Sequence, residues 1–373
     1  MSKFSKSSFL IFLILAVFLF IPAAALNNSI SDDHSARQDQ SEEKFDAGKF
    51  IFEHVLDAYE WHIASFKNKH VSVPLPVILY SKLPELHEGK RVHIFMSSKF
   101  YHGTSDYRGF RISQSERHNG KIVELNQQGE EIGRPVDLSV TKTIVGAIAT
   151  MILLFLTLFA TARSAERNRD KAPKGLQNLI EPIITFIKNE IAIPSIGEKK
   201  YQNFMPALLS LFFFILLNNL MGLVPIFPFG ANVTGNISVT MVFALFTFFV
   251  TNIRGNKYYW KEIFNPDVPF WLKVPIPLMP VLEMTGMITK PFVLMIRLFA
   301  NMLAGHMIVS VFLSLIFIFS SLMGPAAGYA VGPISVIFAV FITLLDILVS
   351  FIQAYVFTLL SAIYFGMATA EGH

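Results

Sequence analysis

Five ionisable side chains lie in the strongly apolar C-terminal part of the chain, and their types are suited to ion transport. Between residues 275 and 370 they are Glu283, Lys290, Arg297, His306 and Asp346. Ionisable groups are rare inside membrane segments and usually mark ion or substrate paths. Histidine and aspartate can take up and release protons, whereas a guanidinium keeps its charge. The set therefore predicts a proton path beside a fixed positive charge.

The spacing of these residues predicts two polar stripes on two helices. Residues of the first stripe are separated by seven, seven and four positions, which keeps them on one helical face: Glu283, Lys290, Arg297 and Asn301. Residues of the second stripe follow at i, i+4 and i+7: Asp346, Ser350 and Gln353. Two apolar helices of this kind should turn their stripes toward each other, toward a water cavity, or toward a partner subunit.

Arg297 and His306 are expected to face different surroundings. A charge at the centre of a bilayer costs about 2.5 to 3.5 kcal/mol on insertion scales, and arginine does not escape by losing its proton. His306 follows Arg297 by nine residues, which places it near the opposite side of the same helix. With Asp346 it forms either a proton relay or a hydrogen-bonded packing pair. Both interpretations place His306 and Asp346 close together.

The composition identifies an integral membrane protein. The 373 residues are 53% hydrophobic and only 16% charged, with positive mean hydropathy. The absence of cysteine excludes disulfides, thiolate metal sites and thiol catalysis. Basic residues flank apolar runs, so membrane topology explains them better than nucleic-acid binding does. There is no phosphate-binding glycine loop. We therefore expect no catalytic site, no metal, no cofactor and no nucleic-acid partner for this chain.

The first 140 residues are predicted to form two parts. Residues 1–25 have the layout of a cleavable signal peptide, with an uncleaved anchor helix as the alternative. Residues 26–140 are polar and predict a small extracytoplasmic α+β domain, with a helix over 45–66 and strands around 71–80, 91–97 and 121–125. His54 and His62 on that helix suggest a metal site, but a solvated helix face is favoured because no tight ligand spacing is present.

Residues 141–373 predict a multi-pass membrane domain. Apolar runs of about the length needed to cross a bilayer are expected to cross at 141–162, 205–225, 237–253, 276–322 and 332–369. The last two are separated by Gly324-Pro325 and Gly332-Pro333 and are long enough to require tilt or bending. Residues 176–191 are too short and too charged to span, and they predict an interfacial helix. The expected fold is an all-α polytopic membrane protein of five crossing helices with a long tilted C-terminal helical hairpin.

Basic segments predict the orientation of these crossings. Arg163, Arg167 and Lys174 follow the first crossing, and Arg254 and Lys257 follow the third. By the positive-inside rule both segments are cytoplasmic. The preceding domain is then outside the cytoplasm, and the C-terminus, after five crossings, is inside.

Several motifs resemble the a subunit of rotary F-type ATP synthases over about residues 140–373. They are KPFVLMIRLFANMLAGH at 290–306, with Glu283 seven residues before it, QAYVF at 353–357, and FILLNNLMGLVP at 214–225. The resemblance implies a proton-translocating stator channel in the inner membrane of a bacterium, with a periplasmic N-terminal domain. It also implies contacts with the c-ring, b-type peripheral stalk subunits and membrane lipids, as part of the H⁺-transporting ATP synthase complex.

The resemblance also implies roles for individual residues. Arg297 matches the family's essential arginine, which faces the carboxylates of the rotating c-ring, and Asn301 and Gln353 match its polar neighbours. His306 and Asp346 fall where the family has a pair of ionisable groups in the half-channel facing the outside, with the two residue types exchanged. The residues expected to line the half-channels are Glu283, Lys290, Asn219 and Ser350. Gly222 stands where some members have an aspartate, and no role is assigned to it.

Two other function classes fit the sequence less well. An ion-coupled secondary transporter also places ionisable residues inside the membrane, but it usually shows paired halves with broken helices, and no internal repeat is visible. An intramembrane hydrolase needs a nucleophile or metal ligands, and His306 with Asp346 lacks a third group at a convincing spacing.

Overall fold

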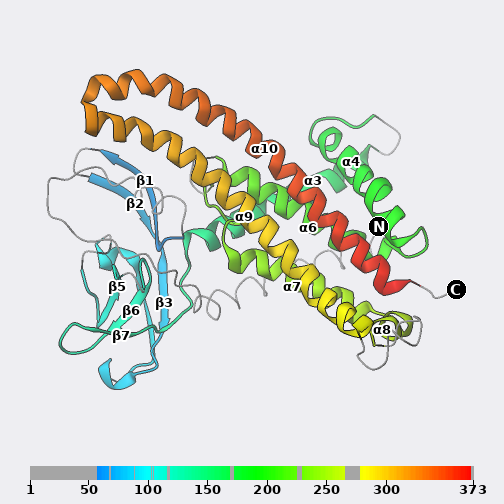
Figure 1. Cartoon of the computed structure of the whole chain (residues 1–373), viewed down its shortest axis with the longest axis horizontal. Coiled ribbons are helices and arrows are strands. Elements are labelled where there is room, and N and C mark those ends of the chain that lie inside the picture. Colours follow the sequence, from blue (N-terminus) through cyan, green and yellow to red (C-terminus); the bar gives the residue numbers. More distant parts are fainter. Residues whose placement is uncertain are drawn as a thin grey trace.

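The computed structural model describes residues 57–370, with gaps at 67–68, 88, 102, 104, 116–117, 169–171, 225–228 and 265–277. The signal peptide expected at 1–25 and the candidate metal ligand His54 lie outside the described residues. Figure 1 shows long helices crossing most of the molecule and short strands gathered near the end where α9 joins α10.

Three small antiparallel sheets form the part of the chain before the first long helix. Their strands are β1 (Glu60–Phe66), β2 (Lys69–Pro74), β3 (Pro76–Tyr80), β4 (Val92–Met96), β5 (Phe110–Ile112), β6 (Ile122–Leu125), β7 (Glu131–Gly133) and β8 (Val136–Asp137). The strand orders are β1-β2, β4-β3-β8 and β5-β6-β7. Val77, Leu79, Phe100 and Phe110 are fully buried between the last two sheets. The strands expected near 71–80, 91–97 and 121–125 are all present.

The prediction of a helix over residues 45–66 is wrong for the part of this range that the structure describes. Residues 60–66 form β1, which pairs with β2 and carries an irregularity between His62 and Ala64. Trp61 on this strand is buried. Pairing with β2 therefore overrides a helical spacing of apolar residues that is ambiguous over so short a stretch. His62 lies on this strand and not on the helix that was expected to carry it.

The rest of the chain is helical. The elements are α3 (Lys142–Arg167), α4 (Leu176–Phe186), the π-helical turn η3 (Ile187–Ala192), α5 (Ile193–Ile196), α6 (Tyr201–Gly222), α7 (Ile237–Arg254), α8 (Lys257–Phe264), α9 (Leu278–Met323) and α10 (Pro325–Thr369). Within the described residues, five of these helices are long and apolar enough to cross a membrane: α3, α6, α7, α9 and α10. The structure confirms the expected architecture: five helices able to cross a membrane, the last two of them long, preceded by a region of small sheets.

The boundaries of two elements differ from expectation. The expected break at Gly332-Pro333 is absent, and α10 begins directly after Gly324, whose φ of 89° makes the turn from α9. Pro333 removes one backbone hydrogen bond without ending the helix, which membrane helices tolerate. The helix predicted at 176–191 becomes π-helical at Ile187, whose side chain is fully buried together with that of Ile191. This segment therefore packs into the helical core at its end.

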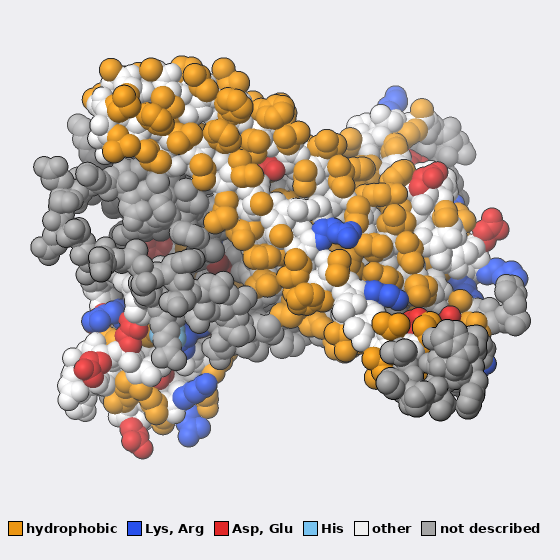
Figure 2. All heavy atoms as spheres, viewed as in Figure 1, with side chains coloured by type: hydrophobic (Ala, Val, Ile, Leu, Met, Phe, Trp, Pro, Cys, Tyr) orange, Lys and Arg blue, Asp and Glu red, His pale blue; other side chains and the backbone are white. Residues whose placement is uncertain are grey.

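The helical core surrounds α6 and the C-terminal half of α10. The last helix packs against α9, α6, α7, α5 and η3, and α3 packs against α4 and α6. Fully buried side chains at these contacts include Leu208, Phe212, Phe243 and Phe365. In contrast, α9 and α10 expose an extensive apolar surface, on which a few basic side chains stand out (Figure 2). A surface of this kind requires lipid or an apolar protein partner.

Candidate functional site

Arg297 lies on the surface of α9. A neighbouring face of this helix is anchored by Leu294, Leu298 and Met302, which are 1%, 1% and 3% exposed. Their i, i+4, i+8 spacing fixes the rotation of α9 and turns both Arg297 and Asn301 outward, where they are exposed. Within the described part of the chain, no acidic side chain forms an ion pair with Arg297. The arginine thus presents an uncompensated charge on an apolar face.

The second polar stripe lies on α10 and is mostly buried. Ser350 is inaccessible, and its hydroxyl donates to the backbone carbonyl of Asp346 at 2.7 Å. Gln353 is 7% exposed, and no hydrogen bond joins it to Arg297 among the described residues.

The backbone of Gly305 brings Asp346 against α9. The carboxyl group of Asp346 occupies the space where a Cβ at position 305 would lie. His306, the next residue, turns instead toward α6, where its Nε2 lies 3.5 Å from the Cβ position of Gly222. The structure therefore places His306 and Asp346 in one region without a hydrogen bond between them, because each packs against a different glycine.

Several buried polar atoms of α6, the 230–236 loop, α9 and α10 have no hydrogen-bond partner. Within the described residues they include Asn218 Oδ1, Asn219 Nδ2, Asn232 Nδ2, His306 Nε2 and Asp346 Oδ2. Asn219 also accepts a hydrogen bond from Thr234 at 2.5 Å, which ties α6 to the 230–236 loop. Buried polar groups are nearly always satisfied by protein or water. Water molecules are therefore the expected partners of these atoms.

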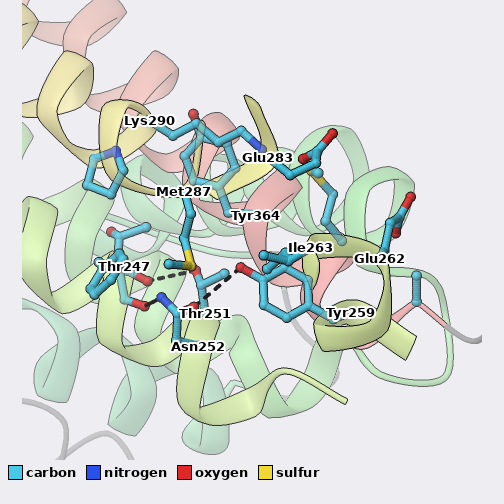
Figure 3. A pocket seen from close by; sticks show the side chains of 14 residues that line it. Thr247, Thr251, Asn252, Tyr259, Glu262, Ile263, Glu283, Met287, Lys290 and Tyr364 are labelled. Carbon is cyan, nitrogen blue, oxygen red and sulfur yellow. Dashed lines mark hydrogen bonds between the residues drawn. The ribbon is translucent and has the colours of Figure 1, made fainter. Parts of the chain in front are cut away.

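A second polar region is a cavity of about 210 Å³ at the other end of α9. Its lining includes Glu283, Met287 and Lys290 of α9 and Thr247, Thr251 and Asn252 of α7. Figure 3 shows Met287 reaching toward the α7 residues, with Tyr364 of α10 beside Lys290. The Lys290 ammonium lies 5.7 Å from the centroid of the Tyr364 ring. The cavity is large enough for several water molecules and opens beside an acidic and a basic group.

Helix α8 closes part of this cavity. The hydroxyl group of Tyr259 donates to Asn252 Oδ1 at 3.4 Å, and Glu262 and Ile263 contribute to the lining. Burial and the nearby charge of Glu283 raise the pKa of Tyr259 above its ordinary value. Its hydroxyl therefore remains a proton donor at neutral pH. Arg297 lies on α9 between this cavity and the His306 region, so the helix carries a charge flanked by two polar spaces.

The chain matches a known family over most of its helical part. A family model described as ATP synthase A chain covers residues 144–366, from the start of α3 to the last turn of α10. The chain belongs to the ATP synthase A chain family. A second model, described as a domain of unknown function (DUF8433), covers residues 50–140. The ATP synthase A chain match thus includes both polar regions, apart from the cavity-lining residues Met367 and Ala370.

Three curated relatives support this membership. ATP synthase subunit a of Chloroherpeton thalassium is 42% identical over 241 residues, which are 63% of this chain and 68% of the relative. ATP synthase subunit a 2 of Chlorobaculum tepidum is 43% identical over 242 residues, 63% of this chain and 64% of the relative. ATP synthase subunit a of Myxococcus xanthus is 41% identical over 262 residues, 67% of this chain and 80% of the relative.

Sequence reasoning missed the residues that shape the two regions. Gly305 and Gly222 carry no ionisable group. They matter because Gly305 leaves room for the Asp346 side chain and Gly222 leaves room for the His306 side chain. Asn218 and Asn232 resemble ordinary polar residues at the end of a helix and in a loop. Tyr364 is one aromatic residue among many. The one signal available for Gly305 was its position directly before His306 in the ATP synthase A chain motif.

Proposed function

We propose that this chain is the proton-translocating stator subunit of a bacterial F-type ATP synthase, embedded in the inner membrane. Family membership supports the general function, and the position of Arg297 supports the mechanism. Its charge lies on the exposed apolar face of α9 and lacks an acidic partner among the described residues. A charge in this place is understandable if mid-membrane carboxylates of another subunit pass in front of it.

The two polar regions act as offset half-channels for protons. The His306 and Asp346 region, with its buried unpartnered polar atoms, conducts protons from the outside to the ring. The cavity lined by Glu283 and Lys290 conducts them from the ring to the cytoplasm. Arg297 lies between these regions on α9. Its permanent charge keeps the facing ring carboxylate ionised and opposes direct passage of a proton between the two half-channels.

The orientation and partners follow from the same proposal. Arg163, Arg167 and Arg254 at the ends of α3 and α7 lie on the cytoplasmic side, which puts the N-terminal sheets in the periplasm. The exposed apolar surface of α9 and α10 contacts the c-ring and lipid. The b-type peripheral stalk subunits hold the chain against rotation. Each elementary charge crossing 100 mV releases about 2.3 kcal/mol, so several protons must be coupled through rotation to each ATP.

The proposal is tested by replacing Arg297 and measuring ATP-driven acidification of inverted membrane vesicles. Arg297→Ala should abolish acidification while the complex still assembles, because the ring carboxylate then has no fixed cation to face. Arg297→Lys should also fail, since an ammonium does not reproduce a guanidinium that stays charged and forked. Arg167→Ala, which removes an exposed arginine at the end of α3, serves as the control. Pumping by Arg297→Ala at the wild-type rate would refute the proposal.

A further inference from the structure

The sheet formed by β4, β3 and β8 is apolar on both of its faces. Its inner face packs on the second three-stranded sheet, where Val77 and Leu79 share a buried cluster with Phe110. Residues paired across an antiparallel ladder carry their side chains on the same face. The strand register and the backbone bonds of residues 138 and 140 therefore define the other face, called here the outer sheet face: Pro76, Ile78, Tyr80, Val92, Ile94, Met96, Val136, Leu138 and Val140.

The outer sheet face is exposed although its side chains are apolar. Ile94 is 66% exposed and Val92 is 56% exposed. The hydroxyl group of Tyr80 is the one polar group among its nine side chains. An antiparallel sheet with one face toward water normally alternates core residues with polar ones. A continuous apolar surface in this place instead indicates a contact with a protein or a membrane.

The outer sheet face extends almost to the first residue of α3. The backbone N–H of Val140 donates to the carbonyl of Pro76 at 3.0 Å, which keeps residue 140 in the sheet. Helix α3 begins at Lys142, two residues later, and two residues span at most about 7 Å. In Figure 1, β3 lies between the helices and the strands β5, β6 and β7, on which the inner face packs. The outer sheet face is therefore turned to the side from which α3 enters the membrane.

A second link fixes the sheets to the start of α3. Asp57 Oδ1 accepts a hydrogen bond from the backbone N–H of Thr143 at 3.0 Å, across 86 residues of sequence. The backbone N–H of Lys142 donates to the carbonyl of Ala58 at 2.9 Å. The first N–H groups of a helix have no partner within the helix, and a carboxylate is a favourable cap for them. The chain thus meets the first turn of α3 both before β1 and after β8, which keeps the sheets close to the membrane surface.

Basic side chains lie at one end of the outer sheet face. Lys90 and Arg91 directly precede β4, Lys82 follows β3 by two residues, and all three are exposed. Arg91 Nη1 donates to the hydroxyl oxygen of Tyr80 at 3.4 Å, so the guanidinium lies beside the apolar side chains. From residue 76 to residue 99, basic residues outnumber acidic ones by four to two. This charge favours an anionic occupant over a second copy of the chain, which would add basic groups of its own.

We propose that the outer sheet face docks on the bilayer beside α3. Val92 and Ile94 lie among the upper parts of the acyl chains, and the three basic side chains contact anionic lipid headgroups. Binding of this kind combines burial of apolar area with attraction to anionic lipid. The docked sheets hold the first turn of α3 at a fixed depth through Asp57. The inference does not depend on the proposed function, because it requires only that α3 crosses a membrane.

The inference is tested by fluorescence quenching of the complete complex in nanodiscs of phosphatidylcholine and phosphatidylglycerol. The chain contains no cysteine, so Ile94→Cys can carry a single bimane label in a complex whose other subunits lack accessible cysteine. A nitroxide on the upper acyl chain of the lipid should quench this label, whereas iodide in the water should not. Ile132→Cys is the matched control, because Ile132 is also exposed but lies on β7 in the other sheet. Its label should be quenched by iodide and not by the lipid nitroxide.

Removal of the basic side chains tests the contact with anionic headgroups. The double substitution Lys90→Gln and Arg91→Gln, made together with Ile94→Cys, should lower the ratio of docked to undocked sheets by about fivefold for each charge removed. The lipid nitroxide should then quench the label less, as it should in nanodiscs of phosphatidylcholine alone. Lys174→Gln removes an exposed lysine beyond the other end of α3 and should leave the quenching unchanged.

Each other result overturns a stated part of the inference. Quenching of the Ile94→Cys label by iodide and not by lipid would show that the outer sheet face is solvated. Protection from both quenchers would show that protein covers it, either another part of this chain, a second copy or another subunit. Equal lipid quenching with and without Lys90 and Arg91 would overturn the contact with anionic headgroups. None of these results changes the expected failure of Arg297→Ala, which tests the stator function separately.

Discussion

Gly305 lets the carboxyl group of Asp346 lie directly against α9. A methyl group at this position would overlap the carboxyl oxygens of Asp346. Gly305→Ala should therefore displace Asp346 and slow proton flux, while α9 itself gains a residue with better helix propensity. The measurement is ATP-driven acidification of inverted vesicles, expressed per assembled complex.

Gly286→Ala on the same helix is the matched control for this substitution. The nearest atom to its added methyl group is a side-chain carbon of Lys290 at 3.7 Å, which is an ordinary van der Waals distance. Flux in this variant should match the wild type. Equal flux in Gly305→Ala and Gly286→Ala would show that the position of Asp346 against α9 does not matter for transport.

At the scale of single residues, the sequence predicted chemical types better than contacts. Arg297 and Asp346 are recognisable because ionisable groups are rare in apolar segments, and their helical spacing indicates which side chains share a face. The spacing does not reveal that His306 packs on Gly222 of a distant helix. That contact depends on how three helices pack together, and a local pattern carries no information about it.

At the scale of elements, the C-terminal end of α10 is held by tight contacts with its neighbours. Lys200 Nζ donates to the carbonyl oxygen of Thr369 at 2.8 Å, and the backbone N–H of Asn256 donates to that of Ala368 at 3.0 Å. These bonds satisfy carbonyl groups that have no partner within the helix. At Gly366 the backbone of α10 approaches the carbonyl of Ser195 in α5 so closely that a Cβ does not fit.

Gly366→Ala should destabilise the protein by pushing α10 away from α5. Overpacking of this kind costs about 1 to 3 kcal/mol. The measurement is the temperature at which half of the detergent-extracted complex loses its assembled form, and it should fall. Gly332→Ala, elsewhere on α10, has no atom within 4 Å of its added methyl group, so its midpoint should stay level or rise. Equal midpoints in the two variants would contradict the close packing of α10 on α5.

The existence of the long helices was predictable, but some of their ends were not. Apolar runs longer than a bilayer crossing predict α9 and α10, because no other structure satisfies their backbone groups in lipid. Pro333 suggested an end that the helix does not have. In α10, sequence rules derived from water-exposed helices overstate the effect of proline. In β1, pairing with β2 makes a strand of a short segment whose apolar spacing also fits a helix.

At the scale of the whole molecule, the apolar surface along α9 and α10 has to be covered by lipid or by an apolar protein partner. Exposed apolar side chains continue along both helices, and Arg297 lies among them. The sequence predicted that the polar stripes face each other, a water cavity or a partner subunit, and the structure turns Arg297 and Asn301 outward. The contact between the N-terminal sheets and α3 was not predictable, since Asp57 and Thr143 are separated by 86 residues and neither belongs to a recognisable motif.

The surface proposed to face the ring can be mapped by cross-linking, because the chain contains no cysteine. Val293 precedes Arg297 by one helical turn and is 48% exposed, so it lies on the same stripe of α9. Val293→Cys should form a disulfide with a cysteine placed beside the mid-membrane carboxylate of the ring subunit, detected as a shifted band on a non-reducing gel. Phe155 is also 48% exposed but lies on α3, a different helix. Phe155→Cys should therefore give no such band, because lipid and not the ring covers that position. Cross-linking at Phe155 but not at Val293 would show that the ring contacts α3. Arg297 would then have no ring carboxylate to face, and the proposed mechanism would be wrong.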